Sequence, residues 1–351
     1  MFKINGIKIG KGYEPYIIAE LSANHGGNIN RAKYSLKAAK EAGASAVKIQ
    51  TYTPDTMTLN SFKKDFLITE GIWKGYSLYQ LYQEAHTPFE WHEELFKYAK
   101  NIGITIFSSP FDESAIDLLE KLEAPAYKIA SFEITDLPLI EYAASKQKPI
   151  LISTGMSNVK EIEEAIDCCI KQGNNKILLL HCISKYPAEI TDYQLGDIKF
   201  LQKKFNLDIG LSDHTISNFA ATLAIAMGAC AIEKHFKLDN KDCGPDSSFS
   251  ITPQQLKSLV IECNLSFKAS KLNHLKRTES EIINKKYRRS LYFVKNLPKG
   301  HTLTKDDIKR IRPGYGLDPK HFQKIIGMRL SKDVEVAEAV SWNSLEIKNI
   351  S

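Results

Sequence analysis

The sequence predicts an α/β fold in which eight parallel strands and the helices between them close into a barrel, followed by a smaller β-rich domain. Eight short apolar runs recur between residues 17 and 235. Segments with apolar residues at three- and four-residue spacing separate these runs, as in amphipathic helices. Polar side chains end run after run, and the carboxyl ends of barrel strands are where such a fold carries its chemistry.

The eight apolar runs are the predicted strands. They read IIAE (17–20), AVKIQ (46–50), ITIFSS (104–109), AYKIAS (126–131), ILIST (150–154), ILLLHC (177–182), DIGLSDH (208–214) and AIEKH (231–235). Alternating strands and helices with short connections require parallel strands, which leaves an open doubly wound sheet or a closed barrel. No G-x-G-x-x-G or G-x-x-x-x-G-K-S/T phosphate loop follows any run, and eight repeats favour a closed TIM (β/α)8 barrel. Closure would gather these polar side chains at one rim: Glu20, Lys48, Gln50, Ser109, Lys128, Ser153, His181, His214, Glu233 and His235.

One connection, residues 54–88, is too long for an ordinary loop after the second strand. Loops at this rim of a barrel shape the substrate pocket. Within it, Trp73, Tyr76, Tyr79 and Tyr82 recur at helical spacing. This spacing predicts a packing stripe rather than a platform for a sugar.

The tail of the chain has a different composition. We expect a barrel over residues 1–267, a polar and charged linker over 268–287, and a small domain over 288–351, whose short apolar runs alternate with turn signals. A domain of about sixty residues is only marginally stable alone, which favours docking on a barrel.

Composition argues against several function classes. The chain has 47 Lys+Arg against 41 Asp+Glu, a net charge of +6 that is scattered, so nucleic-acid binding is not expected. No apolar stretch approaches the ~20 residues of a membrane helix, and the start has no signal-peptide core, so we expect a cytoplasmic protein with no membrane partner. The six cysteines, including Cys182 and Cys243, lack a C-x-x-C pair and are expected to be reduced packing thiols.

A metal site is predicted where two strands end in histidine. His214 and His235 end consecutive strands, and neighbouring strands lie ~4.8 Å apart, so both imidazoles could reach one divalent ion. Oxygens of Glu133, Glu233 or Asp213 would be nearby and leave positions for water and substrate. The alternative is that either histidine is a hydrogen-bonded residue with no ligand.

An anion site is predicted at the same rim. Lys48 and Lys128 end two other strands, and burying two ammonium groups without an anion is unfavourable. Short hydroxyl donors suited to phosphate and carboxylate oxygens accompany them: Ser108, Ser109, Ser131, Ser153, Thr154 and Ser212. The alternative is a set of turn-forming serines and surface lysines.

A set of motifs spread over nearly the whole chain is specific in combination. They are IIAELSANHGG (17–27), AVKIQTY (46–52), FSSPFD (107–112), AYKIASFE (126–133), ISTGM (152–156), HCISKYP (181–187), IGLSDHT (209–215), IEKHF (232–236), GPD (244–246), RRSLY (288–292) and IRPGYGL (311–317). In these motifs the chain resembles the NeuB-type sialic acid synthase family. The stretch 59–91 is similar to the pseudaminic acid branch of that family.

The resemblance implies a barrel followed by an antifreeze-like (SAF) domain, in a domain-swapped homodimer whose tails cap the partner's active site. It also implies a transferase that condenses phosphoenolpyruvate with an N-acetylated amino sugar, giving a nine-carbon 2-keto acid and phosphate, with Mn²⁺ or Mg²⁺ as cofactor. The pseudaminic branch implies 2,4-diacetamido-2,4,6-trideoxy-L-altrose as the sugar, and flagellin glycosylation or capsule modification is consistent with that branch.

Residue roles follow from the matching motifs. The resemblance assigns phosphoenolpyruvate to Lys48, Ser109, Lys128, Ser131, Ser153 and Ser212; the metal to His214 and His235; the sugar to Glu20, Gln50, Tyr186, Asp246 and Arg312; and catalysis to Glu20, Glu133, Glu233 and Lys128. Three other functions stay open: an N-acetylneuraminate or legionaminate synthase with the same chemistry, a metal-dependent barrel aldolase, and a non-catalytic carbohydrate-binding protein.

Overall fold

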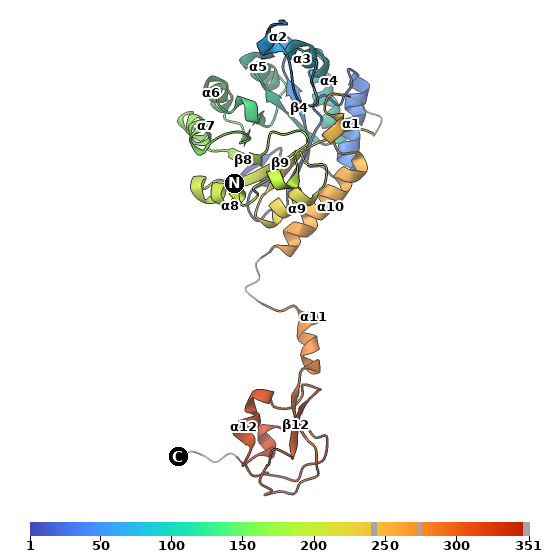
Figure 1. Ribbon diagram of the computed structural model, residues 1–351, viewed down its shortest axis with the longest axis vertical. Helices are drawn as coiled ribbons and strands as arrows, with labels where there is room; N and C mark the ends of the chain where they lie inside the picture. Colours follow the sequence, from blue (N-terminus) through green and yellow to red (C-terminus); the bar gives the residue numbers. More distant parts are fainter. Residues whose placement is uncertain (240–243, 272–275, 347–351) are drawn as a thin grey trace. The chain divides into compact units, whose positions relative to one another are not determined.

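The structure, a computed structural model, describes residues 1–351 except 240–243, 272–275 and 347–351. The chain divides into two compact units, Met1–Lys271 and Leu272–Ser351 (Figure 1). Helices of the described residues include none that is both long and apolar enough to span a bilayer. The expectation for Cys243 falls outside the described residues, while the five described cysteines are free thiols.

Eight parallel strands form a closed barrel in the first unit, as predicted. They are β3 (Tyr16–Glu20), β4 (Ala46–Thr51), β5 (Thr105–Pro110), β6 (Tyr127–Ile129), β7 (Ile150–Ser153), β8 (Ile177–Cys182), β9 (Ile209–Asp213) and β10 (Ala231–His235). Neighbours follow chain order, and β10 pairs with β3 to close the barrel. The strand predicted to include Ser131 is shorter, because Ser131 begins the 3-10 helix η2 (Ser131–Glu133).

Helices surround the barrel (Figure 1). They are α1 (Ile29–Glu41), α4 (Phe89–Ile102), α5 (Glu113–Lys121), α6 (Leu137–Ser145), α7 (Val159–Lys171), α8 (Asp197–Phe205), α9 (Phe219–Ala226) and α10 (Pro253–Ala269). The apolar face of α1 is fully buried at Ala32, Leu36 and Ala39, in one core with the outward-facing apolar residues of the strands. Asn28 caps this helix by accepting hydrogen bonds from the backbone of Asn30 and Arg31.

A hairpin closes the amino end of the barrel, and the sequence analysis did not predict it. Its strands are β1 (Phe2–Ile4) and β2 (Ile7–Ile9). Ile4 and Ile9 pack with inward-facing barrel residues. Asn5 and Gly6 both have positive φ angles, 45° and 83°, as a tight two-residue hairpin turn requires. An Asn-Gly pair between short apolar runs is the signal that could have predicted this hairpin.

The long connection after β4 contains α2 (Pro54–Met57), the 3-10 helix η1 (Lys64–Phe66) and α3 (Leu78–Ala85). The single aromatic stripe predicted here is wrong, because Trp73 precedes α3 rather than lying in it. Tyr76 and Tyr79 donate hydrogen bonds to Glu84 and Asp55 at 2.9 and 3.3 Å. Trp73 and Tyr82 instead line the cavity at the barrel mouth, so the four rings do not form one stripe.

The second unit has a small apolar core of its own, whose buried members are Leu291, Phe293, Leu297, Leu303, Ile308, Ile325, Leu330, Val334, Val340 and Leu345. Its elements are α11 (Glu279–Ile282), η5 (Ile283–Tyr287), β11 (Ser290–Phe293), β12 (Ile308–Ile311), η6 (Pro319–His321), α12 (Phe322–Ile325) and η7 (Trp342–Ser344). Strands β11 and β12 pair antiparallel. The segment 268–287, expected as a linker, thus includes α11 and η5, and α10 extends to Ala269.

The two-residue period of β10 sends alternate side chains to opposite faces. Glu233 and His235 line a cavity at the carboxyl ends of the strands. Lys234 lies between them and points the other way, where its Nζ is 2.6 Å from Asp213 Oδ2 and donates to the Thr215 and Ser217 carbonyls. Both partners of this ion pair have no exposed side-chain surface. The proposal that Asp213 lies near the metal is therefore wrong, since its carboxylate faces away from the cavity.

We expect Lys234→Met to lower the free energy of unfolding by about 3–5 kcal/mol, because it leaves the Asp213 carboxylate buried without its cation. Urea denaturation measures the change. The control is Lys160→Met, whose ion pair with Glu164 is exposed and should contribute nothing measurable. Equal stability of Lys234→Met and the unmodified protein would contradict the buried pair.

Candidate active site

A cavity of about 390 Å³ opens at the carboxyl ends of the barrel strands. Thirteen of the predicted site residues line it: Glu20, Lys48, Gln50, Lys128, Ser131, Glu133, Ser153, Tyr186, Ser212, His214, Glu233, His235 and Asp246. Ser109 lies at its edge, where it accepts a hydrogen bond from Lys48 Nζ at 3.1 Å. Arg312 belongs to the second unit and is exposed just after β12, so its sugar contact stays a prediction.

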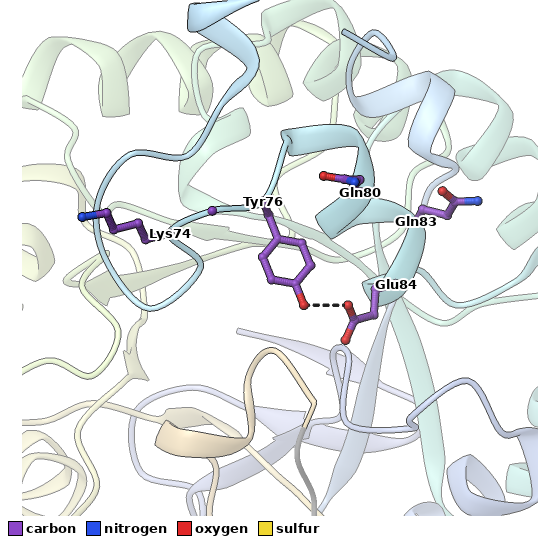
Figure 2. A pocket seen from close by; sticks show the side chains of 6 residues that line it. Lys74, Tyr76, Gln80, Gln83 and Glu84 are labelled. Atoms are coloured by element: carbon purple, nitrogen blue, oxygen red, sulfur yellow. Dashed lines mark hydrogen bonds between the residues drawn. The ribbon is translucent and has the colours of Figure 1, made fainter. Parts of the chain in front are cut away.

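Figure 2 shows a second hollow, of about 610 Å³, beside α3 and the loop before it. It is lined by Lys74, Gly75, Tyr76, Gln80, Gln83 and Glu84, none of which is buried. Size alone does not identify a site. We place the chemistry in the smaller barrel cavity because its polar groups are buried and converge from different strands.

The Lys48 ammonium is the centre of a buried ion cluster. Its Nζ lies 3.0 Å from Glu20 Oε2 and 3.2 Å from Glu233 Oε1. Burial alone would lower the pKa of Lys48, but the charges of Glu20 and Glu233 outweigh it and raise that pKa overall. The argument that both lysines need an external anion is therefore wrong for Lys48, whose charge two carboxylates already balance.

Lys128 is in a different position. Its Nζ donates to the carbonyl of Ile129 at 2.9 Å, and burial lowers its pKa although Glu233 acts in the opposite direction. Nearby, the Ser153 hydroxyl is buried and makes no hydrogen bond to any described residue. Ser131 accepts from the backbone of Gly155 at 3.1 Å. A buried ammonium whose charge is only partly compensated, in one cavity with the unpaired Ser153 hydroxyl, suits an incoming anion.

The cavity carboxyls have divergent acidities. Burial raises the pKa of Glu133 to about 7. Burial, with repulsion from Glu233, also raises the pKa of Glu20 to about 7 against the opposing charge of Lys48. Burial acts in the same direction on Glu233, but Lys48 and Lys128 lower its pKa overall. Carboxyls that differ in this way can hold or accept a proton near neutral pH.

The two predicted metal ligands face each other, with ring centroids 5.5 Å apart. His214 donates from Nδ1 to the Ile183 carbonyl at 2.8 Å, so Nε2 is the ring atom able to bind a cation, which would replace its hydrogen bond with the Cys182 thiol. Burial, then the positive charges of His214 and Lys48, holds the pKa of His235 well below its usual range. Its Nδ1 is buried without a hydrogen-bond partner in the described part of the chain. These features fit a divalent cation.

The described residues include no group of three or more His, Cys, Asp or Glu that could hold a metal ion by themselves. The metal prediction therefore depends on the imidazole pair. The carboxylate of Asp246 is one acidic group beside this pair, since its Oδ2 lies 3.7 Å from His235 Nδ1.

His181 is predicted at the rim and Cys182 in the packing, and the structure reverses both assignments. Cys182 lines the cavity, in register with Ser212 on β9. His181 instead packs edge-on against Tyr193, with ring centroids 6.1 Å apart. Burial raises the pKa of the Cys182 thiol, but His214 outweighs it and brings that pKa to about 7. The strand period explains the outcome, because Leu178 and Leu180 on the same strand also point inward.

An apolar wall faces these polar groups across the cavity. It consists of Met57, Ile68, Trp73, Leu78, Leu81, Tyr82, Ala85 and Phe111, mostly from the connection 54–88. Trp73 Nε1 donates to the Pro245 carbonyl at 3.0 Å, and its ring lies 5.7 Å from that of Tyr186. The prediction that this connection shapes the pocket is confirmed, although its individual contact residues could not be read from the sequence.

Comparisons with known proteins agree with this geometry. The sequence model of the NeuB family matches residues 35–273, and that of the SAF domain matches residues 288–346. A pseudaminic acid synthase of Helicobacter pylori is 45% identical over 334 residues, which cover 95% of this chain and 98% of the relative. An N,N'-diacetyllegionaminic acid synthase of Legionella pneumophila is 37% identical over 350 residues, 98% of each chain.

Among solved structures, the N-acetylneuraminic acid (sialic acid) synthetase of Leptospira borgpetersenii has a TM-score of 0.73 at 30% identity, over 81% of this chain and 94% of that one. The matches cover both units of the chain. The NeuB match and the relative at 45% identity show that the protein belongs to the NeuB family.

Proposed function

We propose that this protein is a cytoplasmic transferase that condenses phosphoenolpyruvate with 2,4-diacetamido-2,4,6-trideoxy-L-altrose, giving pseudaminic acid and phosphate. The observation that carries the proposal is the division of one cavity into a cationic, hydroxyl-rich floor, a pair of imidazoles and an apolar wall. The 45% identity to a pseudaminic acid synthase, against 37% to a legionaminic acid synthase, supports the choice of sugar.

The floor of the cavity would hold phosphoenolpyruvate. Lys128 and the hydroxyls of Ser131, Ser153 and Ser212 can donate hydrogen bonds to its phosphate and carboxylate oxygens. Lys48 becomes available to the same anion when Glu20 takes up a proton, which its pKa of about 7 permits near neutral pH. These groups position the anion so that its methylene carbon can attack the aldehyde carbon of the sugar, and they balance its negative charge.

His214 and His235 would hold a divalent cation, Mn²⁺ or Mg²⁺, which when bound polarises the sugar's aldehyde oxygen. Gln50, Tyr186 and Asp246 would orient the open-chain sugar so that its aldehyde carbon meets the methylene carbon. Glu133 or Glu233 would accept a proton from the water that adds to the former enol carbon. The resulting tetrahedral intermediate collapses by C–O cleavage and releases phosphate, which Lys128 stabilises.

The second unit has a role in the proposal as well. We assign the catalytic barrel to residues 1–267 and the cap to the SAF-type domain of residues 288–351, in a domain-swapped homodimer. Arg312 would then reach the sugar in the cavity of the other subunit. The SAF match at residues 288–346 supports the domain's type.

Removing divalent cations with EDTA is expected to abolish phosphate release, and adding Mn²⁺ or Mg²⁺ should restore it. His214→Ala and His235→Ala should each lower kcat/KM by at least about 100-fold, because each removes a ligand. The control is His86→Ala, which lies outside the cavity at the end of α3. Full activity in EDTA and in both variants would contradict a metal-dependent synthase, whereas no phosphate release from the unmodified protein with Mn²⁺ or Mg²⁺ present would favour a non-catalytic role.

The apolar wall predicts the choice of sugar. It can bury a methyl group and acetamido groups, whereas a mannose-type sugar carries hydroxyls that would lack partners there. We expect kcat/KM for the diacetamido altrose to exceed that for N-acetylmannosamine by at least about 100-fold in a phosphate-release assay. Comparable values would contradict the pseudaminic assignment.

The same assay can separate the synthase from an aldolase that breaks no phosphate bond. Oxygen-18 in the bridging position of phosphoenolpyruvate should be found in the released phosphate, because the C–O bond breaks. An absence of labelled phosphate would contradict the proposed reaction.

Stability of the substrate-free protein should depend on Glu133. Its pKa is about 7 when folded and about 4.3 when unfolded, so its stabilising effect is complete below the unfolded pKa and is lost as pH rises through 7. We expect Glu133→Gln to raise the free energy of unfolding, relative to the unmodified protein, by on the order of 2 kcal/mol more at pH 8 than at pH 5. Urea denaturation in the presence of EDTA measures this difference. Glu164→Gln, at an exposed site on α7, should show no such difference. Equal effects of Glu133→Gln at both pH values would refute the buried acid.

A further inference from the structure

Ser22 occupies an unusual backbone position at the edge of the cavity. It lies two residues after the end of β3, is only 4% exposed, and lines the cavity although it is not among the predicted site residues. Its φ angle is 45°, in the left-handed region that residues with a Cβ rarely adopt. Such a conformation persists where the surrounding structure holds it, and it often accompanies function.

The Ser22 hydroxyl joins two predicted sugar-binding residues that are far apart in the chain. Its Oγ donates to Asp246 Oδ2 at 2.5 Å and accepts from Gln50 Nε2 at 2.9 Å. The backbone N–H of Ala23, the next residue, also donates to the Asp246 carboxylate. Ser22, in its left-handed conformation, and Ala23 therefore both donate hydrogen bonds to the Asp246 carboxylate.

These bonds decide which atoms remain for a ligand. Gln50 Nε2 donates to Glu20 Oε1 at 2.9 Å as well as to Ser22, which uses both of its hydrogens. The amide oxygen of Gln50 is then the atom left to bind a ligand, as an acceptor. Asp246, held by Ser22 and Ala23, likewise offers carboxylate lone pairs. Both groups therefore present acceptors to the cavity.

We propose that Ser22 is a positioning residue that orients Gln50 and Asp246 as a pair of acceptors for donor groups of the sugar, its acetamido N–H or hydroxyl groups. The inference rests on the proposed function, because it takes the sugar to be the ligand of Gln50 and Asp246. Ser22 acts through these two residues, since its own hydrogen is directed at Asp246 and its oxygen accepts from Gln50.

The test compares Ser22→Ala with Ser22→Gly in steady-state kinetics and thermal denaturation. Both variants lack the hydroxyl, so KM for the sugar should rise about 10- to 100-fold in both, while KM for phosphoenolpyruvate stays within about twofold. Only glycine relieves the backbone, so the Tm of Ser22→Gly should exceed that of Ser22→Ala by about 1–3 °C. A merely structural role would lower stability without separating the two KM values.

The matched control is Glu123→Gly. Glu123 also has a positive φ, 56°, but it is exposed after α5 and does not line the cavity. Its replacement should raise Tm by a similar amount and leave both KM values unchanged.

Crystal structures of the unmodified protein and of Ser22→Gly give a readout that needs no turnover. We expect the Gln50 amide or the Asp246 carboxylate to rotate in the variant. Unchanged orientations, an unchanged KM for the sugar, or equal rises in both KM values would each overturn the positioning role. If the unmodified protein fails to use the diacetamido sugar, the proposed function is wrong, and the crystallographic comparison still decides the role of Ser22.

Discussion

The ion cluster of Lys48 with Glu20 and Glu233 is the interaction on which the cavity depends. Its three members come from β4, β3 and β10, so the cluster exists only because the last strand of the barrel pairs with the first. Three nearly unexposed charges would be unfavourable if any one lost its partners. Closure of the barrel and charge balance in its cavity are therefore the same constraint.

The period of the strands distributes chemistry between two faces. On β10, Glu233 and His235 point into the cavity, while Lys234 points outward to Asp213. On β8, Cys182 points inward and His181 outward. The ion pairs of these adjacent residues therefore differ in role. The pair Lys234–Asp213 stabilises the barrel wall, and the pair Glu233–Lys48 sets the acidity of cavity groups.

The cavity combines a rigid part with an added part. The floor comes from strand ends held by the barrel's hydrogen bonds, whereas the apolar wall comes from the connection 54–88, anchored by Trp73 to Pro245. In a scaffold of this kind the strand ends can keep one reaction, while changes in the sequence of the connection alter which ligand binds. In this protein the reaction is assigned to the floor, and the proposed choice of sugar is assigned to the wall.

The sequence by itself determined the barrel, its eight strands and thirteen of the residues that line its cavity, because strand periodicity and motif order are local properties of the chain. Only the tertiary structure decided which side of β8 faces inward, that Glu20 and Glu233 balance Lys48, and that Ser22 links Gln50 to Asp246. These features depend on contacts between residues up to 224 positions apart, and the length of the chain between two residues carries no information about how their side chains meet.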